Sequence, residues 1–310
     1  MNLYFAPLEG ITTSVFRSVH NKLFGFCDYY APFITPTENE KITLKTLKEV
    51  LPENNKDFNL TVQTLSNNPE VFLNFADKIE KIGYNEINLN FGCPSGTVVK
   101  KWRGAGALLD LNALDKFLYE IFERAKIKIS VKTRVGFFKE EEFYEILKIY
   151  NKYPISLLTV HPRTREDYYK GEVRYEFFKD VYPLIKNKVC YNGDINSKKD
   201  LEKIKTDNPA LNDFMIGRGA VKNPAIFREI NGGAKLTTKE LVLFTEELVN
   251  AYKEKGLFDT FIMHKIKEIW LLMIENYPEE TKVNKQIKKA KTSLDILNAI
   301  YKLPEIKKEP

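Results

Sequence analysis

Eight short apolar segments that alternate with stretches of helical periodicity constrain the fold of this chain more than any other feature. The segments are rich in β-branched and aromatic residues, which is typical of buried strands. Strands that alternate with helices form a parallel sheet, and eight of them within about 230 residues favour closure into an α/β barrel of the (β/α)8, or TIM-barrel, type. A doubly wound open sheet is the alternative, but no Gly-x-Gly-x-x-Gly motif follows the first segment. The predicted strands are Asn2–Leu8, Tyr29–Ile34, Asn59–Leu65, Glu86–Gly92, Lys128–Gly136, Leu157–Arg163, Lys188–Asp194 and Asp213–Gly219.

The chain changes character near Gly232. After this point, from Thr237 onward, the apolar residues follow helical spacing only, which predicts an all-helical domain. A chain of 310 residues can form one large domain and a small appendage. We therefore predict a barrel domain over residues 1–233 and a C-terminal helical domain over residues 234–310. The helices predicted between the strands include Glu70–Ile82, Leu111–Ala125, Glu140–Tyr153 and Lys198–Lys205.

Positive charge is concentrated at the C-terminal end. The whole chain carries a net charge of +6, and the segment from Lys282 to Lys308 alone holds eight lysines against two acids, a local net charge of +6. A basic surface of this kind indicates contact with a polyanion, although a solvated helix face is the simpler alternative. The eight lysines are at positions 282, 285, 288, 289, 291, 302, 307 and 308.

The sequence gives no sign of export, membrane insertion or a metal site. No secretory signal pattern opens the chain, and apolar stretches such as Ile269–Ile274 are too short to cross a bilayer. The three cysteines form no Cys-x-x-Cys pair and no metal-like cluster, so we expect reduced thiols and a cytoplasmic protein. Cys27 and Cys190 have the surroundings of small core residues, whereas Cys93 lies in a glycine-containing loop.

Polar residues alternate with apolar ones at the ends of five predicted strands. Successive side chains of a strand point to opposite faces, so Lys132 and Arg134 share one face while Ile129 and the valines share the other. The apolar face should meet the helices, which sends both cations into the barrel mouth, where sites of this fold lie. Buried cations need a partner, so an anionic or strongly hydrogen-bonding ligand is expected there; a self-satisfied polar plug is the alternative. The other residues on this face are Gln63, Asn88, Asn90, Thr159, His161, Arg163, Cys190, Asn192 and Asp194.

The ends of the last two predicted strands indicate a phosphate site. Gly217-Arg218-Gly219 precedes a helix, and Asn192-Gly193-Asp194 ends the strand before it. Glycines let backbone N–H groups approach an anion, and arginine adds a bidentate clamp. In TIM barrels the phosphate site commonly follows strands 7 and 8.

Cys93 begins a loop with features of a nucleic-acid lid. Pro94 stops the preceding strand, so Cys93 is expected to stand exposed at the rim. The loop continues through Lys100-Lys101-Trp102-Arg103, which combines positive charge with an aromatic ring and is followed by Gly104 and Gly106. Glycine hinges and a basic surface suit a lid that closes over a polyanionic substrate.

In these motifs the sequence resembles the tRNA-dihydrouridine synthase family, and the likeness runs from residue 5 to about residue 227. Leu8 stands where the family commonly has Met, and Pro162 stands where it usually has Gly. The helical tail is similar to the family's RNA-binding domain in size, placement and charge. The matching stretches are Ala6 to Gly10, Val62-Gln63, Asn88 to Ser95, Val131 to Arg134, His161 to Thr164 with Tyr168 and Gly171, Asn192 to Ile195, and Gly217 to Ala220 with Asn223-Pro224.

The resemblance implies an enzyme that uses FMN, reduced by NADPH or NADH, to reduce a flipped-out uridine of tRNA. Cys93 would protonate C5 of the base, because a thiol with a pKa of about 8.5 keeps its proton at neutral pH. Lys132 would lie against the flavin edge where charge gathers on reduction. The implied cofactor residues are Pro7, Leu8, Glu9, Gln63, Lys132, His161, Asn192, Asp194, Gly217 and Arg218. The implied substrate residues are Asn90, Arg134, Lys100, Lys101 and Arg103.

Two other functions stay open at this point. The first is an FMN barrel that acts on a free pyrimidine, like dihydroorotate dehydrogenase, although a small substrate needs neither a basic loop nor a basic tail. The second is a catalytically silent RNA-binding barrel, against which Cys93, Lys132 and the Gly-Arg-Gly motif argue. Nothing in the sequence implies a protein partner.

Overall fold

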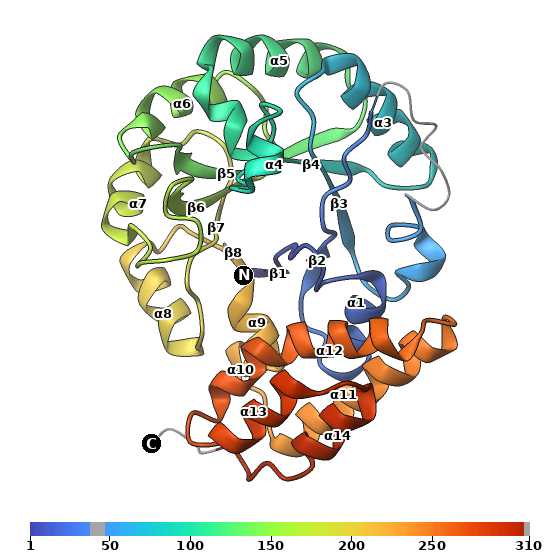
Figure 1. The fold of residues 1–310 in the computed structure, drawn as a ribbon. Helices are drawn as coiled ribbons and strands as arrows, with labels where there is room; N and C mark the ends of the chain where they lie inside the picture. Colours follow the sequence, from blue (N-terminus) through green and yellow to red (C-terminus); the bar gives the residue numbers. More distant parts are fainter. Residues whose placement is uncertain (38–46, 307–310) are drawn as a thin grey trace.

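The computed structural model describes residues 1–37 and 47–306, so Lys307 and Lys308 of the predicted basic segment lie outside the described residues. Eight parallel strands form a closed barrel in the order β1 to β8, which confirms the TIM-barrel prediction (Figure 1). Each strand pairs with the next along the chain, and β1 closes the ring by pairing with β8. The strands are β1 (Asn2–Phe5), β2 (Asp28–Tyr30), β3 (Leu60–Thr64), β4 (Glu86–Phe91), β5 (Lys128–Gly136), β6 (Leu158–Thr164), β7 (Val189–Tyr191) and β8 (Asp213–Ile216).

Several strands are shorter than predicted at the end that faces the barrel mouth. β1 ends at Phe5 rather than Leu8, because Pro7 has no N–H to give to a ladder. β7 ends at Tyr191, and β8 ends at Ile216 before Gly217. Asn192 and Asp194, which were predicted at the end of the seventh strand, therefore belong to the loop that follows β7.

Helices surround the barrel, and their ends follow local signals. Asn68 and Asp110 each accept a hydrogen bond from a backbone N–H of the first turn, which starts α3 and α5 within two residues of the predicted positions. The helix predicted from Glu140 begins at Glu142, whose carboxylate instead accepts hydrogen bonds from three backbone N–H groups of the preceding turn. The helices are α1 (Ser14–Leu23), α3 (Pro69–Lys81), α4 (Gly96–Val99), α5 (Leu111–Arg124), α6 (Glu142–Tyr150), α7 (Tyr175–Val181), α8 (Lys198–Asp207), α9 (Arg218–Lys222) and α10 (Ile226–Ile230).

A small apolar cluster lies inside the barrel. Cys190 is fully buried there and packs with Tyr30 and Met215, so its prediction as a core residue is confirmed. Cys27 is half-buried and packs against the main core from outside the barrel.

Four helices follow the barrel and share its core. Phe244 of α11 packs against Phe16 and Phe24, with ring centroids 5.5 Å apart in both cases. Tyr252 shares a hydrogen bond with Thr13. The predicted boundary at residues 233/234 falls between α10 and α11. Apolar contacts hold the bundle of four C-terminal helices against one side of the barrel, beside α1 and α9 (Figure 1). The four helices are α11 (Thr238–Glu254), α12 (Asp259–Met273), α13 (Thr281–Lys289) and α14 (Ser293–Ile300).

Candidate functional site

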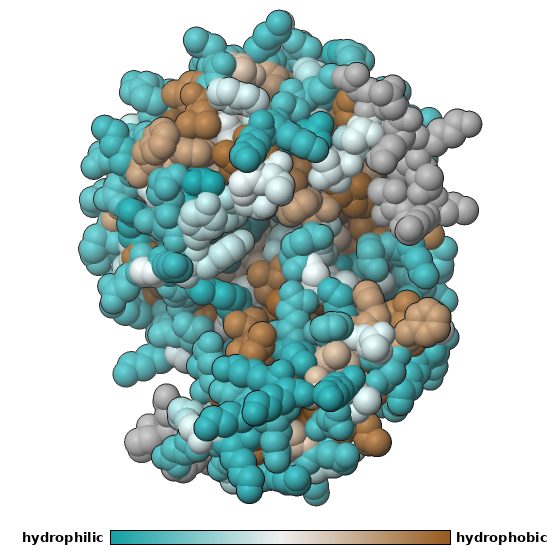
Figure 2. Space-filling view, in the orientation of Figure 1, coloured by the Kyte–Doolittle hydropathy of each residue, from teal (hydrophilic) through white to brown (hydrophobic). Residues whose placement is uncertain are grey.

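A cavity of about 790 Å³ opens at the carboxyl ends of the strands and brings most of the predicted site residues together. The hollowed part of the face drawn in Figure 2 leads to this mouth. Its wall also includes Leu272 and Glu275 from the C-terminal helices, which the sequence analysis treated as a separate domain. Thirteen predicted residues line it: Pro7, Leu8, Glu9, Gln63, Asn90, Cys93, Lys132, Arg134, His161, Asn192, Asp194, Gly217 and Arg218.

Three predicted substrate residues do not line this cavity. Lys100, Lys101 and Arg103 lie just outside, in the segment after α4. Asn67 holds that segment from the β3–α3 connection: its amide donates to the Lys101 carbonyl (3.0 Å) and accepts from Arg103 Nε (3.1 Å). The three cations therefore border the mouth without entering it.

A chain of amide groups crosses the inner face of β3 and β4. Gln63 Nε2 donates to Asn88 Oδ1 (2.7 Å), and Asn88 donates to Ser130 Oγ (2.9 Å). Asn90 Nδ2 donates to Gln63 Oε1 (2.8 Å), while its Oδ1 accepts from the backbone N–H groups of Gly92 (2.9 Å) and Cys93 (2.8 Å). Asn90 thus ties the floor of the cavity to the backbone of Cys93, a positioning role that the sequence did not reveal.

Cys93 is half-buried in the cavity wall rather than exposed at the rim. Burial raises the pKa of its thiol, so the thiol keeps its proton at neutral pH. Arg134 fixes the chain beside it, because its Nε donates to the Gly92 carbonyl (2.7 Å) and its Nη1 to the Thr164 carbonyl (2.7 Å). This position suits a proton donor whose place is set by the surrounding backbone.

Two glycines of the cysteine loop, residues 92–106, are required by packing. Gly104 has a φ of +55°, and a Cβ there would lie 2.8 Å from the Cys93 carbonyl oxygen. A Cβ at Gly106 would lie 2.7 Å from the Val99 carbonyl oxygen. Only glycine allows these two approaches, so the hinge role predicted for both residues is not needed to explain them.

Lys132 and His161 present unsatisfied polar atoms to the cavity. Among the described residues no hydrogen bond or ion pair involves Lys132 Nζ; burial and, secondarily, the Arg134 charge lower its pKa to about 8. His161 Nδ1 contacts the Asn192 carbonyl oxygen at 2.5 Å and must donate to it. Its Nε2 is buried without a partner, and burial, followed by the charges of Lys132 and Arg134, lowers its pKa well below the usual value. The site therefore offers one free donor and one free acceptor.

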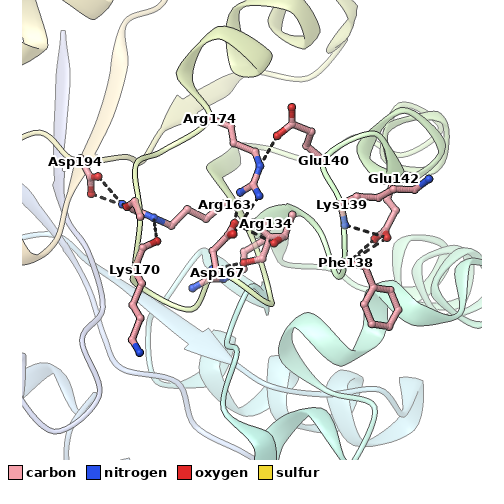
Figure 3. Close-up of polar contacts among 12 residues, drawn as sticks. Arg134, Phe138, Lys139, Glu140, Glu142, Arg163, Asp167, Lys170, Arg174 and Asp194 are labelled. Atoms are coloured by element: carbon pink, nitrogen blue, oxygen red, sulfur yellow. Dashed lines mark hydrogen bonds and ion pairs between the residues drawn. The ribbon is translucent and has the colours of Figure 1, made fainter.

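Asp194 organises the arginines at the other side of the mouth (Figure 3). Arg163 is buried and bidentate to it, with Nη1–Oδ1 at 3.0 Å and Nη2–Oδ2 at 2.5 Å. Arg218 Nη2 donates to the same Oδ1 (3.1 Å), and Arg218 Nη1 donates to the Tyr169 carbonyl (3.2 Å). The carboxylate predicted to touch the cofactor is thus occupied in orienting Arg218, which remains 44% exposed and can receive an anion.

Tyr169 is a site residue that the sequence analysis missed. Its ring lies against two guanidinium groups, with Arg134 Cζ 5.3 Å and Arg218 Cζ 5.8 Å from the ring centroid. It belongs to the tyrosine loop, residues 165–174, which Asp167 and Arg174 join by an ion pair, and Arg174 also pairs with Glu140 (Figure 3). The nearby tyrosine at position 168 was the one signal in the sequence that pointed to this loop.

Within residues 1–37 and 47–306, no group of three or more His, Cys, Asp or Glu side chains could hold a metal ion. Over the same ranges, no helix is long and apolar enough to span a membrane.

Comparison with known proteins identifies the family. The family model described as dihydrouridine synthase matches residues 4–301, which is nearly the whole chain. The chain belongs to the dihydrouridine synthase family. The predicted resemblance and the prediction of an enzyme are confirmed, and the family match extends through the helical tail, beyond the likeness seen from residue 5 to about 227.

Named relatives of this dihydrouridine synthase agree with the family match. It is 33% identical over 263 residues to a probable tRNA-dihydrouridine synthase of Helicobacter pylori, covering 82% of this chain and 79% of the relative. It is 30% identical over 243 residues to a tRNA-dihydrouridine(16) synthase of Neisseria meningitidis, covering 74% and 72% of the two chains.

Solved structures of low identity share the fold of this dihydrouridine synthase. Histamine dehydrogenase from Rhizobium sp. 4-9 matches with a TM-score of 0.58 at 12% identity, over 81% of this chain and 49% of that chain, about half its length. Morphinone reductase matches with a TM-score of 0.52 at 9% identity, over 76% of this chain and 87% of that chain. At these identities the likeness shows the barrel fold alone.

Proposed function

We propose that this dihydrouridine synthase reduces a uridine of tRNA to 5,6-dihydrouridine with FMN as its cofactor and NADPH or NADH as the reductant. The observation that carries the proposal is the meeting of Cys93, Lys132 and His161 in one cavity, with a protonated thiol, a free ammonium and a free ring nitrogen. The protein leaves Lys132 Nζ of β5 and His161 Nε2 of β6 without a partner, and the Cys93 thiol lines the same cavity, so the three groups suit a ligand.

The cavity suits FMN by size and by the chemistry of its wall. Its volume of about 790 Å³ lies within the usual range of cofactor sites. Arg218, oriented by Asp194, would bind the phosphate, with Gly217 and Asn192 beside it, while Lys132 would meet the ring edge that becomes anionic on reduction. His161 Nε2 would accept a hydrogen bond from the cofactor. Bound FMN would supply the hydride.

Cys93 would act as the general acid toward the substrate base. Its buried thiol keeps the proton until a carbanion-like centre develops beside it, and the Asn90 and Arg134 hydrogen bonds hold its backbone in place.

The C-terminal helices offer a surface for the tRNA backbone. A groove of about 460 Å³ between α13 and α14 is lined by Lys282, Lys285, Lys289 and Lys302. Counterion release from phosphates would favour binding there and make it dependent on salt. A free pyrimidine has no use for such a surface, and a tRNA substrate accords with an enzyme of the cytoplasm.

The proposal is tested by measuring dihydrouridine in tRNA after incubation with the purified protein, FMN and either NADPH or NADH. Cys93→Ala should keep its flavin absorbance and lose turnover. Cys27→Ala is the matched control, because this half-buried cysteine does not line the cavity, and it should remain active. Normal turnover by Cys93→Ala would refute the general-acid role of Cys93. If the enzyme reduced a free pyrimidine faster than it reduced tRNA, tRNA would be refuted as its substrate.

A further inference from the structure

Trp102 is an exposed tryptophan in an unusual backbone conformation at the edge of the cavity. Its side chain is 54% exposed, and its φ of +55° lies in the left-handed region that bulky residues rarely adopt. Among the described residues, its ring makes no aromatic or cation contact. A large ring that is held in a strained backbone conformation and is more than half exposed points to a role outside the fold.

Hydrogen bonds on both sides hold this turn in place. The Trp102 N–H donates to the Val99 carbonyl (2.9 Å), and the Arg103 N–H donates to the Val98 carbonyl (3.3 Å). Asn67 binds the Lys101 carbonyl and Arg103 Nε from outside the loop. The indole is therefore presented on a supported backbone, so little conformational entropy remains to be lost when a ligand stacks on it.

The position of Trp102 relates it to the reacting end of the cavity. Val98 lines the cavity, and Gly104 packs directly against Cys93, whose Cβ would lie 2.9 Å from a Cβ at that position. Trp102 and Gly104 are two residues apart, and two residues of chain span at most about 7 Å. The backbone of Trp102 is therefore close to Cys93, the residue proposed to protonate the target base. Its side chain is absent from the cavity lining, while Val98 of the same turn lines it, so Trp102 belongs to a segment at the edge of the mouth.

The positive charge next to the Trp102 ring indicates which kind of ligand the ring binds. Lys100, Lys101 and Arg103 flank Trp102 in the sequence, and none of them forms an ion pair in residues 1–37 and 47–306. An exposed aromatic ring among unpaired cations suits a single-stranded nucleic acid, whose bases stack on the ring while the phosphates meet the charges. An uncharged apolar partner would leave these cations without compensation.

We propose that Trp102 stacks against an unpaired base of the RNA substrate next to the target uridine, with the phosphate of that nucleotide near Lys101 and Arg103. This inference rests on the proposed function and adds a substrate contact to it. A stacked base is worth enough that removing the ring should weaken RNA binding about 5-fold to 150-fold.

Tryptophan fluorescence tests the inference directly, because the chain has only two tryptophans. Trp270 is fully buried and donates to Thr245 Oγ1 (3.0 Å), so its emission reports the integrity of the fold. The long-wavelength emission of Trp102, obtained as the difference between the wild type and Trp102→Phe, should be quenched by tRNA and by an unstructured RNA oligonucleotide. Fully paired RNA and inorganic polyphosphate should leave it unchanged.

Binding and turnover give a second test. Trp102→Leu keeps an apolar side chain without the ring, and it should raise KM for tRNA while leaving kcat and flavin content unchanged. Its binding should keep the salt dependence of the wild type, whereas Lys101→Ala should reduce that dependence. The inference would be overturned if Trp102→Leu and the wild type bound tRNA with equal affinity. It would also be overturned if polyphosphate quenched the Trp102 emission as much as RNA does, or if an acidic polypeptide quenched it and RNA did not. Absence of dihydrouridine with the wild-type enzyme would instead count against the proposed function.

Discussion

Two arginines of the cavity depend on Asp194, and its replacement by asparagine is expected to destabilise the flavin-free protein. Arg163 has a side chain that is 1% exposed, and both oxygens of Asp194 neutralise it, at 3.0 and 2.5 Å. Asparagine keeps the shape but removes the charge and replaces one acceptor by an amide donor. The buried guanidinium then retains the Gly171 carbonyl (2.5 Å) but no anion.

The expected magnitude follows from the burial of the two partners. Removing one partner of a fully buried pair costs about 3 to 5 kcal/mol. Because Asp194 is 32% exposed, water can replace part of its contribution, and we expect about 2 to 3 kcal/mol. For 310 residues, an unfolding entropy of about 2.1 cal/mol/K per residue makes 1 kcal/mol equal to about 1.5 °C, so the midpoint should fall by about 3 to 5 °C.

Thermal unfolding with and without FMN measures both consequences. The midpoint of flavin-free Asp194→Asn should fall as stated, and the rise caused by added FMN should be smaller than in the wild type, because Arg218 also loses its partner. Glu166→Gln is the matched control, since this carboxylate pairs with Arg165 at a surface position 48% exposed, and it should change stability by less than about 1 kcal/mol. An unchanged midpoint for flavin-free Asp194→Asn would falsify the argument that Arg163 needs this carboxylate.

Three further predictions concern other parts of the cavity. Lys132→Met should stabilise the flavin-free protein by about 3 kcal/mol near pH 7, because the pKa of Lys132 is about 8 in the folded protein and 10.5 in the unfolded chain. This gain should vanish as the pH rises from 8 to 10.5. Urea unfolding at several pH values measures it, and a gain that did not change with pH would mean that the lysine is not buried as a charge. Gly219→Ala should lose about 1 to 3 kcal/mol and FMN affinity, since a Cβ would overlap the Ile195 carbonyl oxygen, whereas Gly96→Ala, with open space around it, should be neutral in the same titration. Asn90→Ala removes the acceptor of two backbone N–H groups, so kcat should fall about tenfold or more while the flavin absorbance is retained. If the variant had the kcat of the wild type, Cys93 would not need the Asn90 hydrogen bonds to its backbone for turnover.

The sequence by itself determined the elements and the face of each strand that carries polar groups. Period-2 alternation is a local property, so Lys132, Arg134 and His161 could be assigned to the barrel interior without knowledge of any partner. The same holds for Gly217 and Arg218 at the end of β8, because barrel topology brings all strand ends to one mouth.

Only the tertiary structure decided what these side chains do to one another. Asn90 binds Gln63 because the register of β3 and β4 places them together, and register is set by closure of the whole barrel. Tyr169 reaches Arg134 and Arg218 through a loop that Arg174 ties to Glu140, in the connection between β5 and α6. The wall contributed by Leu272 likewise depends on how the helical bundle packs against the barrel. Hydrogen bonds and packing across long sequence separations leave no periodic trace in the chain, whereas the pleat of a strand and the turn of a helix do.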